Sequence, residues 1–149
     1  EKLLDRSMDG RMLDDVVMFL EERLELAVSR GVPIESTILD PGPDFGKTPA
    51  QTVEVLRGIE RVQAIGRPLL LAIGRKDFIG AATGRPPKQR EAGTLAAFAW
   101  GTRAGGHVFR VHDVAAFRDF LAVTEILEGH VDLPADTMLA EGLRREPTA

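Results

Sequence analysis

The sequence predicts an α/β protein in which one helix precedes three strand–helix units with parallel strands. Three short apolar runs alternate with longer amphipathic stretches, which is typical of a parallel sheet covered by helices: Ser36–Leu39, Pro68–Ile73 and His107–Val111. A polar residue follows each run closely, and these residues lie 36 positions apart: Asp40, Lys76 and His112. Because ligands bind at the carboxyl ends of parallel strands in such folds, we expect the functional site there.

The first two helices are predicted from apolar stripes at helical spacing. The first begins near Met12 and ends before Gly31 and Pro33, residues that are common at and after helix C-termini. The second begins after Thr48, and Gly66 ends it.

Between them, Asp40–Lys47 contains two prolines and two glycines, which exclude a helix or a central strand. We therefore expect a structured loop that leads directly into the second helix. Thr48 and Gln51 predict a capping box there, and Pro49 suits the first helical turn.

The second strand leads into a basic stretch, Gly80–Arg90, which we interpret as a mobile surface loop with solvated Arg85, Lys88 and Arg90. The helix predicted next, Glu91–Arg103, is apolar on nearly every side. It should therefore be buried against more than one neighbour.

After the third strand, Asp113 is predicted to cap a last helix over Val114–Gly129. From His130 the pattern breaks down, with one short helical turn expected at Met138–Leu143. Residues 1–130 thus form the predicted domain and 131–149 a C-terminal tail.

Three parallel strands cannot close a barrel, so the chain is either part of a larger barrel or a small open sheet. A closed barrel of eight strand–helix units typically needs about 250 residues, and this chain has 149. The sequence begins at Glu1 rather than Met, which indicates a processed, engineered or partial chain.

Composition excludes several classes of function. A net charge of −4 gives no electrostatic case for binding nucleic acid. No apolar run approaches the roughly 18 residues of a membrane span. The absence of cysteine suits a cytoplasmic protein.

The polar residues at the predicted strand ends could bind an anion. Arg110 and His112 lie two apart on a strand and so share a face, and Lys76 comes from the neighbouring strand. Three donors fit a phosphate or pyrophosphate better than one carboxylate. Asp40 would suit the N–H groups of a heterocycle. Lys47, beside a helix N-terminus, is either solvated or reaches a ligand phosphate.

The same residues could instead have purely structural roles. Arg110 could simply form an ion pair with Asp113 or Asp40, and a single His112 at a strand end could be structural.

Four motifs, in order and in register, resemble the dihydropteroate synthase family. They are D-P-G-x-x-F-G-K at Asp40–Lys47, R-K-x-F-I-G at Arg75–Gly80, G-T-L-A at Gly93–Ala96 and R-V-H-D at Arg110–Asp113. The resemblance implies a (β/α)8 barrel of the TIM type, of which this chain would cover about the last three strand–helix units and the preceding helix.

The family joins a dihydropterin pyrophosphate to p-aminobenzoate, releases pyrophosphate and uses Mg2+. By resemblance, Lys76, Arg110 and His112 would be catalytic, with Arg110 and His112 on the pyrophosphate. Asp40 would bind the pterin, and Phe45 would lie near the aminobenzoate. The full set of substrate-binding residues implied by the resemblance is Asp40, Phe45, Gly46, Gly74, Arg75 and Lys76. The Mg2+ ligand would lie outside this chain. A cytoplasmic homodimer without nucleic-acid or membrane partners is expected.

Three positions depart from the family pattern. Gly74 replaces a usual Ser, Asp77 places a negative charge where an anionic substrate should approach, and Asp44 replaces a usual Gly. Two hypotheses follow: a dihydropteroate synthase, or a non-catalytic or repurposed relative that binds a pterin or an anion. The departures predict poor p-aminobenzoate binding, which Gly74→Ser with Asp77→Ser should improve at least tenfold.

Overall fold

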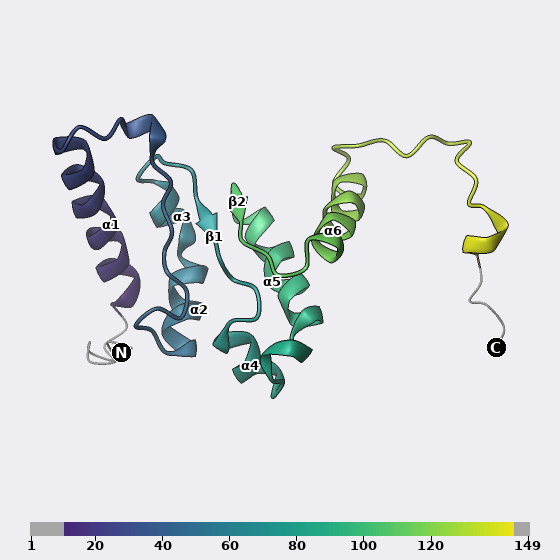
Figure 1. The fold of residues 1–149 in the computed structure, drawn as a ribbon, viewed down its shortest axis with the longest axis horizontal. Coiled ribbons are helices and arrows are strands. Elements are labelled where there is room, and N and C mark those ends of the chain that lie inside the picture. The colour runs from purple at the N-terminus through teal and green to yellow at the C-terminus, as the bar shows by residue number, and fades with distance from the viewer. Residues whose placement is uncertain (1–10, 145–149) are drawn as a thin grey trace. The chain divides into compact units, whose positions relative to one another are not determined.

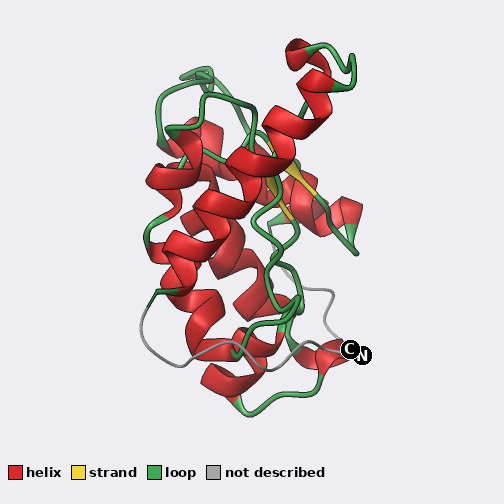
Figure 2. Cartoon of the chain, turned by 90° about the vertical axis from the view of Figure 1, so that its left-hand side faces the viewer, coloured by secondary structure: helices red, strands yellow, loops and turns green. Residues whose placement is uncertain are grey.

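A computed structural model describes residues 11–144, which are mainly helices and loops with short strands (Figures 1 and 2). They fall into two compact units that divide between Val114 and Ala115. Residues 1–10, at the start of the predicted domain, and residues 145–149, at the end of the predicted tail, lie outside the described residues.

The strands pair in parallel, as predicted. β1 (Leu70–Leu71) pairs with β2 (Val108–Phe109), with Leu70 opposite Val108 and Leu71 opposite Phe109. An isolated parallel bridge joins Leu39 to Leu69, so the Leu39 segment and β2 lie on opposite sides of β1. The second and third predicted strands are therefore present but shorter than expected.

The prediction of a first strand at Ser36–Leu39 is wrong, except that Leu39 forms the parallel bridge to Leu69. Ile34–Ser36 forms a short 3₁₀ helix, η1. The hydroxyl of Thr37 donates a hydrogen bond of 2.6 Å to the carbonyl of Ile34 and closes this turn locally. Such side-chain bonds compete with strand pairing.

The helix preceding the loop is confirmed as α1 (Met12–Ser29). The second predicted helix is divided, because Gly58 separates α2 (Pro49–Arg57) from α3 (Ile59–Gln63). A Cβ atom at Gly58 would collide with the side chain of Leu13 on α1. Any side chain at position 58 would therefore force the end of the Leu13 side chain to move.

The predicted capping box at the start of α2 is confirmed. The hydroxyl of Thr48 accepts from the backbone N–H of Gln51 at 3.2 Å, and the Gln51 side chain accepts from the N–H of Thr48 at 2.9 Å. This box fixes the point at which the Asp40–Lys47 loop enters the helix.

The predicted mobile loop Gly80–Arg90 is largely structured. α4 (Asp77–Thr83) begins directly after Lys76 and ends at Gly84, whose φ of 69° suits a glycine C-cap. A short 3₁₀ helix, η2 (Pro87–Gln89), follows. The next helix, α5 (Glu91–Arg103), has the predicted bounds.

The core lies where β1 meets the surrounding helices. Leu69, Leu71 and Ile73 are fully buried, and Phe98 of α5 packs edge-to-face on Phe109 with ring centroids 5.7 Å apart. Gly101 brings α5 close to the sheet, since a Cβ atom there would lie 3.0–3.1 Å from Leu71, Ile73 and Phe109. The strand-end loops are thereby built on a rigid base.

The second unit contains α6 (Val114–Leu127), close to its predicted bounds, and η3 (Glu141–Leu143). The helical turn expected at Met138–Leu143 is thus present but shorter. Among the described residues, no helix is long and apolar enough to cross a membrane. The domain boundary expected at residue 130 stays a prediction.

Candidate functional site

The loop Asp40–Lys47 is held by its own polar side chains. Asp40 directly follows the bridged Leu39, and its carboxylate accepts the N–H of Gly42 at 2.8 Å. The ammonium of Lys47 donates to the carbonyls of Gly42 at 2.9 Å and Phe45 at 3.2 Å. Lys47 therefore closes the loop rather than being freely solvated. Because it also lines the neighbouring cavity, its contact with a ligand phosphate stays a prediction.

Burial lowers the pKa of the Lys47 ammonium below the usual value for lysine. The nearby carboxylates of Asp40 and Asp44 oppose this shift, whereas the charge of Lys76 adds to it. Two cations and two carboxylates thus act on one another within this part of the chain.

A cavity of about 450 Å3 lies between α1 and this loop. Its volume is within the range usual for small-molecule sites. The α1 side contributes both apolar residues and Asp15, and the loop side contributes three predicted site residues, Asp40, Phe45 and Gly46. Phe45 is 69% exposed, so its ring is available to a ligand.

Lys76 is directed toward the same loop. Its ammonium donates to the carbonyl of Pro43 at 2.9 Å and lies 4.8 Å from the centre of the Phe45 ring. This is a cation–π geometry, in which the face of the aromatic ring attracts the ammonium. The structure thus brings together Lys76 and Phe45, two residues predicted to contact substrate.

Asp44 joins this loop to α4. Its carboxylate accepts the backbone N–H of Asp77 at 2.7 Å and the hydroxyl of Thr52 at 3.3 Å. The N–H of Asp44 also donates to that hydroxyl, at 3.1 Å. With a φ of 65°, Asp44 has a conformation that few residues other than glycine adopt, and these bonds offset its cost.

Arg75 is directed away from Lys76, toward α5. It has a φ of 59°, and its backbone N–H donates to the buried hydroxyl of Thr94 at 3.0 Å. Its guanidinium forms an ion pair with Glu91 at 3.2 Å. The predicted substrate contact of Arg75 remains a prediction.

Arg90 is a residue of this site that sequence reasoning missed. It was expected to be solvated, but its side chain is only 11% exposed. Its guanidinium donates to the carbonyls of Arg75 at 2.8 Å and Lys76 at 3.1 Å, and contacts the carboxylate of Asp77 at 3.4 Å. No motif could have revealed this role, because three of the four partners of the Arg90 guanidinium are backbone carbonyls.

Gly74 and His112 lie side by side. A Cβ atom at the buried Gly74 would be 3.6 Å from Nδ1 of His112. Arg110 and His112 lie beyond the end of β2 and are exposed, so strand pleating does not fix them on one face as expected. In the described part of the chain, neither side chain has a hydrogen bond or an ion pair, including the Arg110 pairs with Asp113 or Asp40 considered from the sequence.

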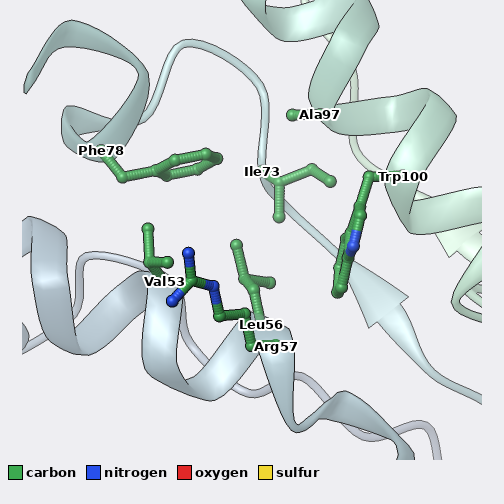
Figure 3. A pocket seen from close by; sticks show the side chains of 7 residues that line it. All are labelled: Val53, Leu56, Arg57, Ile73, Phe78, Ala97 and Trp100. Atoms are coloured by element: carbon green, nitrogen blue, oxygen red, sulfur yellow. The ribbon is translucent and has the colours of Figure 1, made fainter. Parts of the chain in front are cut away.

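A second cavity, of about 210 Å3, lies among α2, α4, α5 and the end of β1 (Figure 3). Its lining is apolar except for Arg57, and in this view the Phe78 ring points toward Ile73 and lies above Val53. None of the predicted site residues lines it. Phe78 follows Asp77 immediately, so this apolar contact helps to anchor the start of α4.

The expected Mg2+ site can be tested by asking whether side chains that could bind the ion lie close together in this structure. Within residues 11–144, no group of three or more His, Asp or Glu side chains is placed to hold a metal ion. The described residues therefore do not fit a metal site, and we assign no chemical step to one.

These features define an α/β protein with parallel strands and a candidate ligand site on the loops that follow them. Residues 4–112 match the family model described as pterin binding enzyme. The chain belongs to the pterin binding enzyme family.

The chain is similar to both active and inactive relatives. It is 36% identical over 118 residues to "Inactive dihydropteroate synthase 2" of Mycobacterium leprae, covering 79% of this chain and 40% of that protein. It is equally identical, over 121 residues, to "Dihydropteroate synthase" of Streptococcus pyogenes serotype M6, covering 80% of this chain and 46% of that protein. The chain thus spans less than half the length of these relatives.

Solved structures support the same fold. The dihydropteroate synthase of Xanthomonas albilineans in complex with 7,8-dihydropteroate matches with a TM-score of 0.78 and 36% identity, over 88% of this chain and 48% of that one. The enzyme of Thermus thermophilus in complex with 6HMPPP matches with a TM-score of 0.75 and 38% identity, over 82% and 48%. The predicted fold class, part of a (β/α)8 barrel of the TIM type, is confirmed.

Proposed function

We propose that these residues form part of a dihydropteroate synthase, a transferase of folate biosynthesis. One observation carries the proposal: in a member of the pterin binding enzyme family, the Lys76 ammonium lies over the exposed Phe45 ring, beside a cavity lined by Asp40. This arrangement suits a substrate with a flat ring, N–H donors and a negatively charged leaving group.

In the proposed reaction, the amine nitrogen of p-aminobenzoate forms a bond to the methylene carbon of a dihydropterin pyrophosphate. The carbon–oxygen bond to pyrophosphate breaks, the bonding pair leaves with the pyrophosphate, and the amine loses a proton. Asp40 would accept N–H groups of the pterin, and Lys76, Arg110 and His112 would stabilise the leaving group. No covalent nucleophile on the protein is required.

Two finer features belong to the same proposal. Homodimers are the commonest soluble oligomers, which supports a homodimer. The absence of cysteine supports a cytoplasmic location. Mg2+ is included by likeness to the family alone.

The test uses the complete gene product that carries these residues. Pyrophosphate release should require both a dihydropterin pyrophosphate and p-aminobenzoate. By calorimetry, Arg110→Gln should weaken pyrophosphate binding by about tenfold to a hundredfold, the range expected for a charged hydrogen bond of about 1.5–3 kcal/mol. Asp40→Asn should instead weaken pterin binding. Equal losses for both ligands in both variants would contradict this division of roles.

A non-catalytic relative is the second candidate, and one observation favours it: the similarity to the inactive Mycobacterium leprae protein is as high as that to the Streptococcus pyogenes enzyme. In that case the gene product would bind a pterin without releasing pyrophosphate. If it bound neither a pterin nor pyrophosphate, both proposals would fail.

A further inference from the structure

The backbone turn that carries Lys76 is fixed from two directions by residues without a role in the proposed reaction. From one direction, the Asp44 carboxylate accepts the N–H of Asp77 at 2.7 Å. From the other, the Arg90 guanidinium donates to the carbonyls of Arg75 and Lys76 at 2.8 and 3.1 Å. Residues 75–77 are thus bonded through backbone groups on both sides of the Lys76 Cα atom.

The Asp44 contact crosses between two loops that are 33 positions apart in sequence. Asp44 has an unfavourable positive φ, and its side chain is fully used by Asp77 and Thr52. Since Lys76 also donates to the carbonyl of Pro43, the residue before Asp44, the two loops are joined at adjacent positions. The bond made by Asp44 therefore lies directly beside the bond made by the Lys76 ammonium.

The Arg90 contact is equally specific. The guanidinium occupies the space in which any side chain at Gly80 would lie. Its Nε atom also donates to the carbonyl of Arg85 at 2.8 Å. A planar guanidinium can bond several carbonyls in fixed directions, which a lysine or glutamine cannot reproduce. Arg90 therefore fixes the Lys76 turn directly before α4 begins.

We propose that Asp44 and Arg90 are positioning residues that hold the Lys76 ammonium over the Phe45 ring. Asp44 acts through the N–H of Asp77, and Arg90 acts through the carbonyls of Arg75 and Lys76. Neither residue contacts substrate. That this placement serves catalysis rests on the proposed function, whereas the placement itself is measurable without a substrate.

The test is a nuclear magnetic resonance spectrum of the complete gene product labelled at lysine Cε, with the Lys76 signal identified by its loss in Lys76→Arg. Because the ammonium lies 4.8 Å from the Phe45 ring centre, the ring current should shift the adjacent Cε protons upfield, and Phe45→Leu should abolish that shift. Asp44→Gly and Arg90→Gln should each remove at least half of it. Asp44→Asn should preserve it, since asparagine tolerates the positive φ and keeps an acceptor oxygen.

Asp44→Gly and Asp44→Asn form a matched pair, because both residues suit the backbone conformation and only one retains the acceptor. Lys88→Gln, on the exposed η2, is the control that should change nothing. An unchanged Lys76 signal in Asp44→Gly and Arg90→Gln would overturn the inference, and so would equal losses in both Asp44 variants. If Arg90→Gln fails to fold, the Asp44 pair decides.

The kcat values of the same variants provide a second test, because a purely structural role for Asp44 and Arg90 would not change kcat selectively. Asp44→Gly should lower kcat by about tenfold to a hundredfold, as expected for a catalytic group displaced by about 1 Å, and Asp44→Asn should restore it. The affinity for inorganic pyrophosphate should fall by less than kcat does, because Arg110 and His112 are intact and only the Lys76 contact is weakened. Absent turnover in the unmodified protein would count against the proposed function, and the spectra would still decide the positioning roles.

Discussion

Gly74 is enclosed by side chains, which changes the expected effect of a substitution there. A Cβ atom would lie 3.2 Å from Cγ2 of Thr94 and 3.3 Å from Cζ of Phe98, which is closer than most contacts of a Cβ atom. Gly74→Ser should therefore lower the free energy of unfolding by about 1–3 kcal/mol, the usual cost of overpacking. Denaturant unfolding would measure this, with Gly142→Ala as the control, since no atom lies within 4 Å of that position.

The same geometry directs a serine hydroxyl toward His112, whose Nδ1 atom lies 3.6 Å from the Cβ position. Gly74→Ser should then be less destabilising than Gly74→Ala if the hydroxyl bonds the imidazole, which is worth about 0.5–1.5 kcal/mol. Equal stability of the two variants would contradict that contact.

The structure also revises the role expected of Asp77. From the sequence, Asp77 is expected to place a negative charge where an anionic substrate should approach. Asp77 instead contacts Arg90 at 3.4 Å and is 52% exposed, while Arg75 pairs with Glu91. Because Arg90 offsets much of this charge, Asp77→Ser alone should improve p-aminobenzoate binding by less than the tenfold expected from the sequence for the double substitution.

At the scale of single residues, the sequence predicted which positions carry charge but not how those charges are paired. Asp40, Lys76 and His112 stand out because each follows an apolar run. Arg90 does not, because its hydrogen bonds go largely to backbone carbonyls that are the same in every sequence. Contacts of this kind become visible only when the chain is folded.

At the scale of secondary structure, Gly58 determines how α1 packs on α2 and α3. The helical pattern predicted one continuous helix here, because a glycine within it is tolerated at a cost of about 1 kcal/mol. The sequence could not show that Leu13 occupies the space beside this glycine. By contrast, the capping box at Thr48 was predictable, because its partners lie three positions apart.

Gly58→Ala should therefore destabilise the protein, although alanine favours helices. Overpacking against Leu13 should cost about 1–3 kcal/mol and exceed the gain in helix propensity, which is at most about 1 kcal/mol. Adding Leu13→Ala to Gly58→Ala should recover part of the loss, which a double-mutant cycle of unfolding free energies would detect. Additive effects of the two substitutions would contradict this packing.

At the scale of the whole molecule, the strand–helix order was predictable because apolar runs and helical stripes alternate regularly. The lengths of the strands were not, because the described strands are only two residues long and their ends depend on pairing. Within residues 11–144, the sheet ends at β2 on one side and at the Leu39 segment on the other. Both edges carry exposed apolar residues: Ile38 at 53% and Val108 at 39%.

Open sheet edges promote pairing between chains, so these 149 residues expressed alone should self-associate. Sedimentation velocity at concentrations from about 1 to 100 µM should show a growing share of dimers and larger species. Val108→Lys, which places a charge on the β2 edge, should weaken this association at least tenfold. Val131→Lys is the matched control and should have little effect, because Val131 lies outside the sheet and is 47% exposed, against 39% for Val108. A monomer across the whole concentration range, or equal effects of the two lysines, would show that the strand edges do not drive association.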